Sequence, residues 1–212
     1  MTRRGPWPGL VVTLAGLTLG TPDHAAGQDT ARTADSGMAL PPAGFGTLRQ
    51  DAIAIKLQAG NVEVRVLPMD ERVIRLLARD SYESLHALRE ARARQIADAV
   101  TRRGQRQPSL FVVTFFGLQP QAQITPEDVV IASGNRVFHP LDILPLSPLW
   151  NQLRLNQRET ATAVYVYEEG IAPLESLTVS YGGFSSSQWD STLRTLNEER
   201  ARVVARSGAR TP

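Results

Sequence analysis

The fold is decided by SLFVVTFFG at residues 109–117, together with TATAVYVYEEG at 160–170 and LTVSYGG at 177–183. The first segment is apolar on both faces except for Thr114, which is typical of a strand inside a sheet or under a helix. The second alternates strictly and places Ala163, Tyr165 and Tyr167 on one face. Residues 109–183 are therefore predicted to be a block of β-structure.

Two hairpins belong to this β-structure. Residues 52–57 and 62–67 alternate around Gly60-Asn61, and residues 128–132 and 136–138 surround Ser133-Gly134-Asn135, where Gly and Asn suit a tight turn. In the first hairpin, six apolar side chains are expected to face the core: Ile53, Ile55, Leu57, Val62, Val64 and Val66. Prolines interrupt residues 141–149, so that segment is expected to be irregular or an edge strand.

Helices are expected before and after the β-block along the chain. Asp70 offers a cap for a short helix, and a longer one should run from Asp80 or Ser81 to about Arg103. A C-terminal helix should follow a capping box at residues 187–190 and end near Arg206. Its apolar stripe is interrupted by Arg200 and consists of Trp189, Leu193, Leu196, Val203 and Val204.

The long helix carries enough arginine to raise the question of an anion-binding face. The residues concerned are Arg89, Arg92, Arg94, Arg102 and Arg103. Acidic residues are interleaved with them, which favours a solvated helix that packs one side on the sheet.

The N-terminus resembles a cleavable export signal. Arg3 and Arg4 precede a short apolar run at residues 10–19, and small residues at 25–27 suit signal-peptidase cleavage before Gln28. The run is too short for a bilayer, which needs about 20 apolar residues. We therefore expect a signal peptide at 1–27, a disordered linker at 28–45, one domain at 46–208 and a disordered tail at 209–212.

Composition limits the function classes. The chain has no cysteine, which excludes disulfides, thiolate metal ligands and a cysteine nucleophile. The formal net charge is +2, and loss of Arg3, Arg4 and Asp23 with the signal would leave about +1, so the balance gives no reason to expect nucleic-acid binding. No cofactor, and no membrane span after cleavage, is expected.

The strand order resembles the immunoglobulin-like (telokin-like) sandwich domains of secreted bacterial proteins. The elements concerned are the strand at 111–116, a Pro-acid-acid element with a strand at 126–131, a Gly-turn-aromatic-Pro element at 134–140, and a strand ending in aromatic-acid at 165–168. The resemblance covers about a third of the chain. It implies a scaffold that mostly binds and brings no catalytic residues. The fold class expected is therefore α+β: a mainly antiparallel β-sandwich with one long inserted helix and one C-terminal helix.

The candidates for chemistry are few. His139 and Asp142 flank Pro140-Leu141 and could begin a metal site or an acid–base pair, although a metal site needs three or more ligands. Tyr165 and Tyr167 share a strand face and could line a ligand groove or form a bed for packing; packing is favoured. No catalytic, cofactor or metal set is assigned, and these four residues are the only candidate ligand face.

Two functions remain. The first is an exported, non-catalytic module, periplasmic or extracellular, that binds a protein or glycan partner in the cell envelope. The alternative is a secreted hydrolase or metal-binding protein that uses His139 and Asp142. The sequence does not indicate which partner it binds or its oligomeric state.

Overall fold

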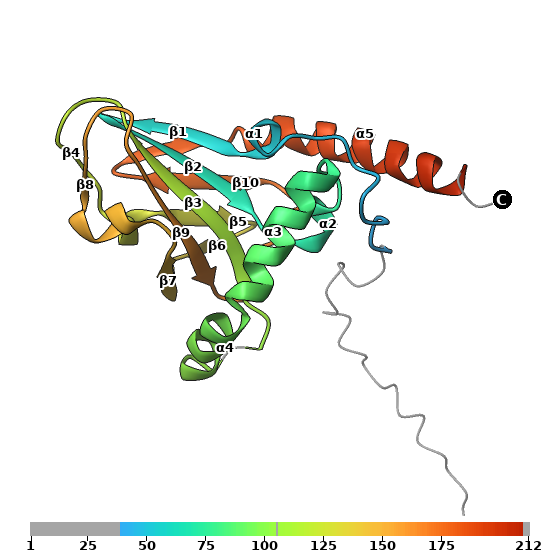
Figure 1. The fold of residues 1–212 in the computed structure, drawn as a ribbon, viewed down its shortest axis with the longest axis horizontal. Coiled ribbons are helices and arrows are strands. Elements are labelled where there is room, and N and C mark those ends of the chain that lie inside the picture. Colours follow the sequence, from blue (N-terminus) through green and yellow to red (C-terminus); the bar gives the residue numbers. More distant parts are fainter. Residues whose placement is uncertain (1–38, 105, 210–212) are drawn as a thin grey trace, which may run out of the picture. The chain divides into compact units, whose positions relative to one another are not determined.

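The computed structural model describes residues 39–104 and 106–209. This part of the chain is a mixed α+β protein whose sheets are antiparallel (Figure 1). The predicted signal peptide and most of the predicted linker lie outside the described residues.

The larger sheet has five strands in the order β1-β2-β3-β9-β7. Their bounds are Ile55–Ala59, Val62–Pro68, Ser109–Gly117, Thr160–Tyr167 and Asp142–Pro145. The apolar strand β3 lies in the middle, where Val113 pairs with Val66 of β2 and Ala163 of β9. The prediction of an interior strand is confirmed, and β7 is an edge strand as its prolines indicated.

The second sheet has four strands in the order β11-β10-β5-β6. Their bounds are Phe184–Ser186, Leu177–Tyr181, Val130–Ser133 and Arg136–Phe138. Two short strands, β4 (Ala122–Gln123) and β8 (Arg154–Leu155), form a separate pair. Residues 184–186, for which the sequence indicated no strand, form β11 and pair with β10.

Two-residue turns set the register of three hairpins. Gly60 and Gly134 have positive φ as the first residue of their turns, which is the pattern of type II′. Gly182 and Gly183 both have positive φ, which is the pattern of type I′. Glycine pays no Cβ penalty there, so the sequence selects tight turns at these points.

The main core receives side chains from both sheets. The alternate residues Phe111, Val113 and Phe115 of β3 and Tyr165 and Tyr167 of β9 are buried in it. The second sheet contributes Ile131, Phe138, Leu177, Val179 and Tyr181. All six side chains predicted to face the core from the first hairpin region are buried.

The first predicted hairpin strand begins later than the alternation indicated. Residues 50–53 form the short helix α1 (Gln50–Ile53), and β1 starts at Ile55. Ile53 is nevertheless fully buried, because a single helical turn and an extended segment can point one side chain to the same core. Periodicity over two residues cannot distinguish these cases.

The predicted long helix is two helices, α3 (Arg79–Ala91) and α4 (Ala93–Arg102), separated at Arg92. The break has a packing reason. Leu85 of α3 joins the main core, whereas Ile96 and Val100 of α4 join a second cluster with Leu110, Val164 and Val166. These last three residues alternate with the core-facing residues of β3 and β9, so α4 packs on the opposite face of the five-stranded sheet.

Asp70 caps the short helix α2 (Glu71–Ile74) as predicted, since its carboxylate accepts a hydrogen bond from the Arg72 amide at 2.8 Å. The C-terminal helix α5 (Trp189–Gly208) begins without a side-chain cap, so the predicted capping box is not formed. Instead, Trp189 is fully buried and its indole donates to the Pro173 carbonyl at 3.0 Å.

The tyrosines of β9 give a stability prediction. Phenylalanine at Tyr165 or Tyr167 should lower the free energy of unfolding by about 1–3 kcal/mol each, because a buried carbonyl would lose its donor. Tyr82→Phe is the control, since Tyr82 is partly exposed and water can replace the contact of its hydroxyl with Arg75, while the ring still stacks on His86. Urea denaturation measures all three. Equal, negligible effects would contradict a packing role for the two hydroxyls.

Candidate functional site

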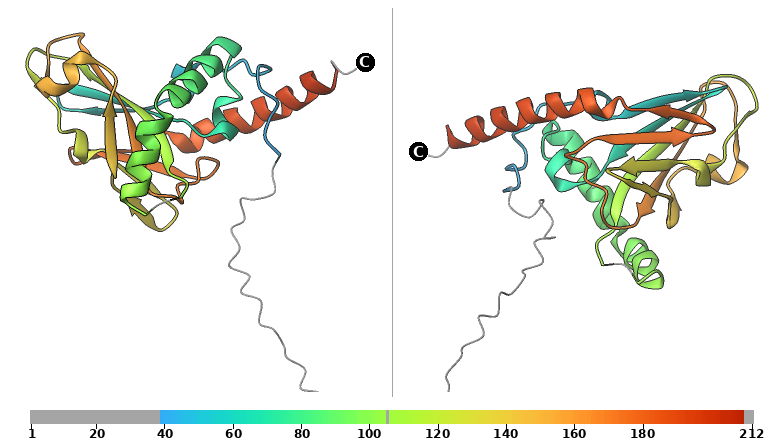
Figure 2. Two further views of the ribbon diagram at one scale, coloured as in Figure 1. Left: turned by 60° about the horizontal axis from the view of Figure 1, so that its bottom comes forward. Right: turned by 180° about the vertical axis from the view of Figure 1, so that it is seen from behind.

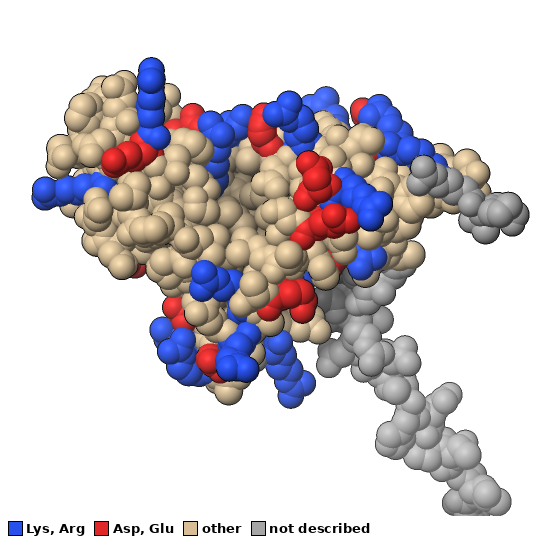
Figure 3. Space-filling model, in the orientation of Figure 1, with Lys and Arg blue, Asp and Glu red and all other residues tan. Residues whose placement is uncertain are grey.

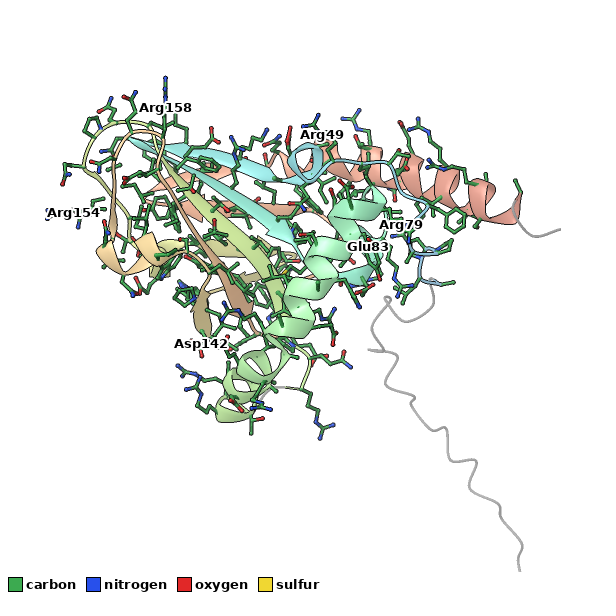
Figure 4. The ribbon with its side chains drawn as sticks, in the orientation of Figure 1. Arg49, Arg79, Glu83, Asp142, Arg154 and Arg158 are labelled. Atoms are coloured by element: carbon green, nitrogen blue, oxygen red, sulfur yellow. The ribbon has the colours of Figure 1, made fainter. Side chains whose placement is uncertain are left out.

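Asp142, one of the two candidate residues, is engaged by α4 and by its own strand. The Asp142 carboxylate accepts from Arg102 Nη2 at 2.6 Å and from the Ile143 amide at 2.9 Å (Figure 4). His139 is exposed, and no hydrogen bond joins it to Asp142 among the described residues. Asp142 thus serves to connect β7 to α4.

Tyr165 and Tyr167 lie in the interior, with no exposed surface. The Tyr165 hydroxyl donates to the Pro126 carbonyl and the Tyr167 hydroxyl to the Val129 carbonyl, both at 2.9 Å. Burial raises the pKa of both phenols, so they remain neutral donors at any physiological pH. A soluble ligand cannot reach either ring, and the four residues considered from the sequence do not share a surface.

The surface that remains is the outer face of the four-stranded sheet. Because side chains alternate along a strand, the residues between the core-facing ones point away from the core. Two cross-strand rows result, one containing Thr178, Ala132 and Val137 and the other Ser185, Ser180 and Val130. We call these six residues the outer sheet face.

The outer sheet face is uncharged and open. All six side chains are neutral, and each is at least partly exposed. Val137 is 63% exposed, the largest value among the exposed large hydrophobic residues described. In the right-hand view of Figure 2 the strands of this sheet face the reader, with no helix over them. Its polar groups are the hydroxyls of Thr178, Ser180 and Ser185.

A buried carboxylate that the sequence reading missed lies on α5. Glu199 is 1% exposed and accepts from the Thr47 amide and the Thr47 hydroxyl, both at 2.9 Å. Arg206 also donates to the same oxygen, and Arg202 lies 3.6 Å from the other. Glu199 therefore fastens the segment before α1 to the C-terminal helix.

The helical spacing could have revealed Glu199. The buried residues of α5 recur every three or four positions: Trp189, Thr192, Leu196, Glu199 and Val203. An acid on that stripe needs a partner, and Thr47 and Arg206 supply it. Val204, which was placed on the apolar stripe, is 57% exposed and lies off it.

The polar residues around Glu199 are used to hold the fold together. A recess of about 440 Å³ adjoins Thr47 and Arg206 and is also lined by Gly44, Phe45, Gly46 and Ala209. Both polar residues in that lining are already bonded to Glu199. The predicted linker extended to residue 45, yet Pro41 is buried and Phe45 packs against the core, so folded structure begins before residue 46.

Burial by itself raises the pKa of Glu199, but hydrogen bonds from Thr47 and Arg206 outweigh it, and the pKa lies below its ordinary value. Glu71 shows the same balance. Its burial is outweighed by hydrogen bonds from Arg75 and His86, and its pKa is also lowered. Both carboxylates are therefore ionised at neutral pH, each with cations around it.

No group of three or more His, Cys, Asp or Glu side chains that could hold a metal ion occurs within residues 39–104 and 106–209. Over the same residues, no helix is long and apolar enough to cross a membrane. Comparison with protein-family models, curated proteins and solved structures finds no match to this chain.

The Glu199 contacts predict an acid-sensitive stability. Glu199→Gln should cost about 1.5–3 kcal/mol at neutral pH, because charged hydrogen bonds to Thr47 and Arg206 are weakened. Since the folded-state pKa is depressed, this contribution is complete above the ordinary carboxyl pKa of 4.5. It should disappear as the pH falls below 4.5 through the folded-state pKa.

Denaturation of wild type and Glu199→Gln across pH 3–7 measures the difference. The adjacent Glu198→Gln is the matched control, since Glu198 is exposed and its ion pair with Arg202 lies at the surface. Its cost should stay below about 0.5 kcal/mol. A difference between wild type and Glu199→Gln that does not vary with pH would show that the charge of Glu199 is unimportant.

Proposed function

We propose that this chain is an exported, non-catalytic module of the immunoglobulin-like sandwich type, which binds a protein partner through the outer sheet face. The observation that carries the proposal is the character of that face: six neutral side chains on one side of a sheet, with Val137 largely exposed. The buried centres of protein interfaces are depleted of charge in the same way. A face of this kind can be covered by a partner without leaving a charge buried and unpaired.

A protein partner is favoured over a glycan by the position of the aromatic rings. Sugar rings are usually held by exposed aromatic side chains. Here Trp150, Trp189 and Tyr181 are buried together with the β9 tyrosines. Phe184, at 52% exposure, is the one exposed aromatic among the large exposed hydrophobic residues of the described chain. None of the six residues of the outer sheet face is aromatic, so this face offers no ring on which a sugar could stack.

The sandwich is supported by the two antiparallel sheets that share the main core. Further support comes from the hydroxyls of β9, which bond to the segment leading into β5 of the other sheet. The helices α3 and α4 between β2 and β3 are an addition to the simple sandwich. The hydrolase alternative has less support, since Asp142 is engaged by Arg102.

The binding surface is tested by a matched pair of substitutions. Val137→Arg places a charge on the outer sheet face, and Val204→Arg places one on an equally exposed position of α5, at 63% and 57% exposure in the wild type. Each immobilised variant is compared with wild type for partners retained from envelope extract. We expect a protein that wild type and Val204→Arg retain and Val137→Arg loses by at least about tenfold, since a buried unpaired charge costs several kcal/mol.

Retention of the same proteins by both variants would contradict the assignment of this face. If wild type binds a glycan on a glycan array and Val137→Arg does not, the outer sheet face is the binding surface but its partner is a glycan, not a protein. Circular dichroism spectra should be the same for all three chains, because both positions are exposed.

Export is tested on the N-terminus. When the full chain is expressed in a bacterium, mass spectrometry of the exported protein should give a mature N-terminus at Gln28, because small residues at 25–27 precede it. Replacing Gly27, the residue just before the cleaved bond, by a bulky residue such as Phe should block cleavage at that site and leave the unprocessed chain. Recovery of only full-length chain in the cytoplasm from the wild-type sequence would contradict export.

A further inference from the structure

Positive charge is concentrated in one short segment. Residues 89–106 contain six arginines and two acids, a net charge of +4, whereas the formal net charge of the whole chain is +2. The remainder of the chain therefore carries −2. The small net charge of the whole chain does not reveal this uneven distribution of charge. From the sequence alone, the arginines of the segment were assigned to a solvated helix.

The segment centres on α4, which lies at the lower end of the described fold in Figure 1. Its apolar side is already occupied, since Ile96 and Val100 pack on Leu110, Val164 and Val166. Figure 3 shows blue side chains predominating on the opposite side of this region. The helix is thus fixed to the sheet and presents its charged side outward.

Three of these arginines have no evident structural task. Arg102 pairs with Asp142, and Arg89 lies 4.0 Å from Glu71. Arg94, Arg103 and Arg106 are exposed and make no ion pair among the described residues. We call these three the α4 arginines. Asp98 lies one turn from Arg94 on the same helix and is also exposed.

We propose that the α4 arginines dock the protein on the surface of an anionic phospholipid membrane by binding lipid phosphates. Guanidinium groups bind phosphate in a bidentate manner and are weakly hydrated, so arginine suits this contact. Because the apolar side of α4 is buried against the sheet, the contact is electrostatic, without insertion of the helix. It is independent of the outer sheet face.

A membrane surface explains the geometry better than the alternatives. The charges stand on one outward-facing end of the fold, so a planar array of phosphates can approach several of them together. A single soluble anion would need converging donors in a recess, and the recess of 440 Å³ described above is lined by Arg206 instead. Single-stranded nucleic acid is usually held by exposed aromatic rings beside the charges, and every residue from 89 to 106 is non-aromatic.

The test is co-sedimentation of the full chain with vesicles of phosphatidylglycerol and phosphatidylcholine, compared with pure phosphatidylcholine. The variant carries Arg94→Gln, Arg103→Gln and Arg106→Gln. The matched control carries Arg49→Gln, Arg154→Gln and Arg158→Gln, three exposed arginines away from α4 that also lack ion pairs among the described residues (Figure 4). Both triple variants lose the same total charge, so a difference between them reports position alone.

We expect binding to the anionic vesicles to weaken on the order of tenfold or more in the α4 variant, since each basic residue near such a surface contributes about fivefold. The control should weaken by less than about threefold, because its arginines lie away from the docked surface. Asp98→Asn should strengthen binding, which a folding defect would not do. Pure phosphatidylcholine vesicles report any binding by the apolar N-terminal segment.

Four results would overturn the proposal. Equal loss in the two triple variants would show a response to total charge only. Equal binding to both kinds of vesicle would show that the phosphates of anionic lipids are not recognised. Selective release by inorganic phosphate, at the ionic strength of a chloride control, would indicate a discrete anion pocket. Binding through the α4 arginines to an oligonucleotide but not to vesicles would identify a nucleic-acid surface.

Discussion

The structure depends most on the hydrogen bonds that three tyrosines make to one short segment, residues 125–129. Tyr165 and Tyr167 donate to the carbonyls of Pro126 and Val129, and the Tyr181 hydroxyl accepts from the Thr125 amide at 3.0 Å. This segment leads into β5, so the larger sheet fixes where the second sheet starts. In a low-dielectric interior such bonds are individually strong, and a missing partner is costly. The Tyr165 ring also packs on the rings of Tyr167 and Trp150, so the residues that make these hydrogen bonds are part of the apolar core.

Because the aromatic residues are used to pack the core, they limit which surfaces can bind a partner. Rings that hold two sheets together have no free face or hydroxyl for a ligand. The available surface is then the side of each sheet turned away from the shared core. On the five-stranded sheet α4 covers part of that side, whereas the outer sheet face carries only small, neutral side chains. The candidate binding surface thus follows from the packing of the core.

Strands were predictable from the sequence because their signals are local. The apolar run of β3, the alternation of β9 and the glycine turns each fix an element within a few residues. The break at Arg92 was not predictable, because it accompanies a change in the cluster that the helices fill, with Leu85 of α3 in the main core and Ile96 and Val100 of α4 in the second cluster. Glu199 was missed for a similar reason, since its partner Thr47 lies 152 residues away in the chain. The candidate site followed from cross-strand registers, which a single sequence does not contain.

The two proposed surfaces lie on opposite sides of the layered structure. The outer sheet face belongs to the four-stranded sheet, and α4 packs on the face of the five-stranded sheet that is turned away from the shared core. A partner on the neutral face would therefore leave the α4 arginines exposed. The Arg102–Asp142 pair and the apolar contacts of Ile96 and Val100 hold α4 against that sheet. A membrane bound at α4 would then turn the neutral face outward, where a protein partner could reach it.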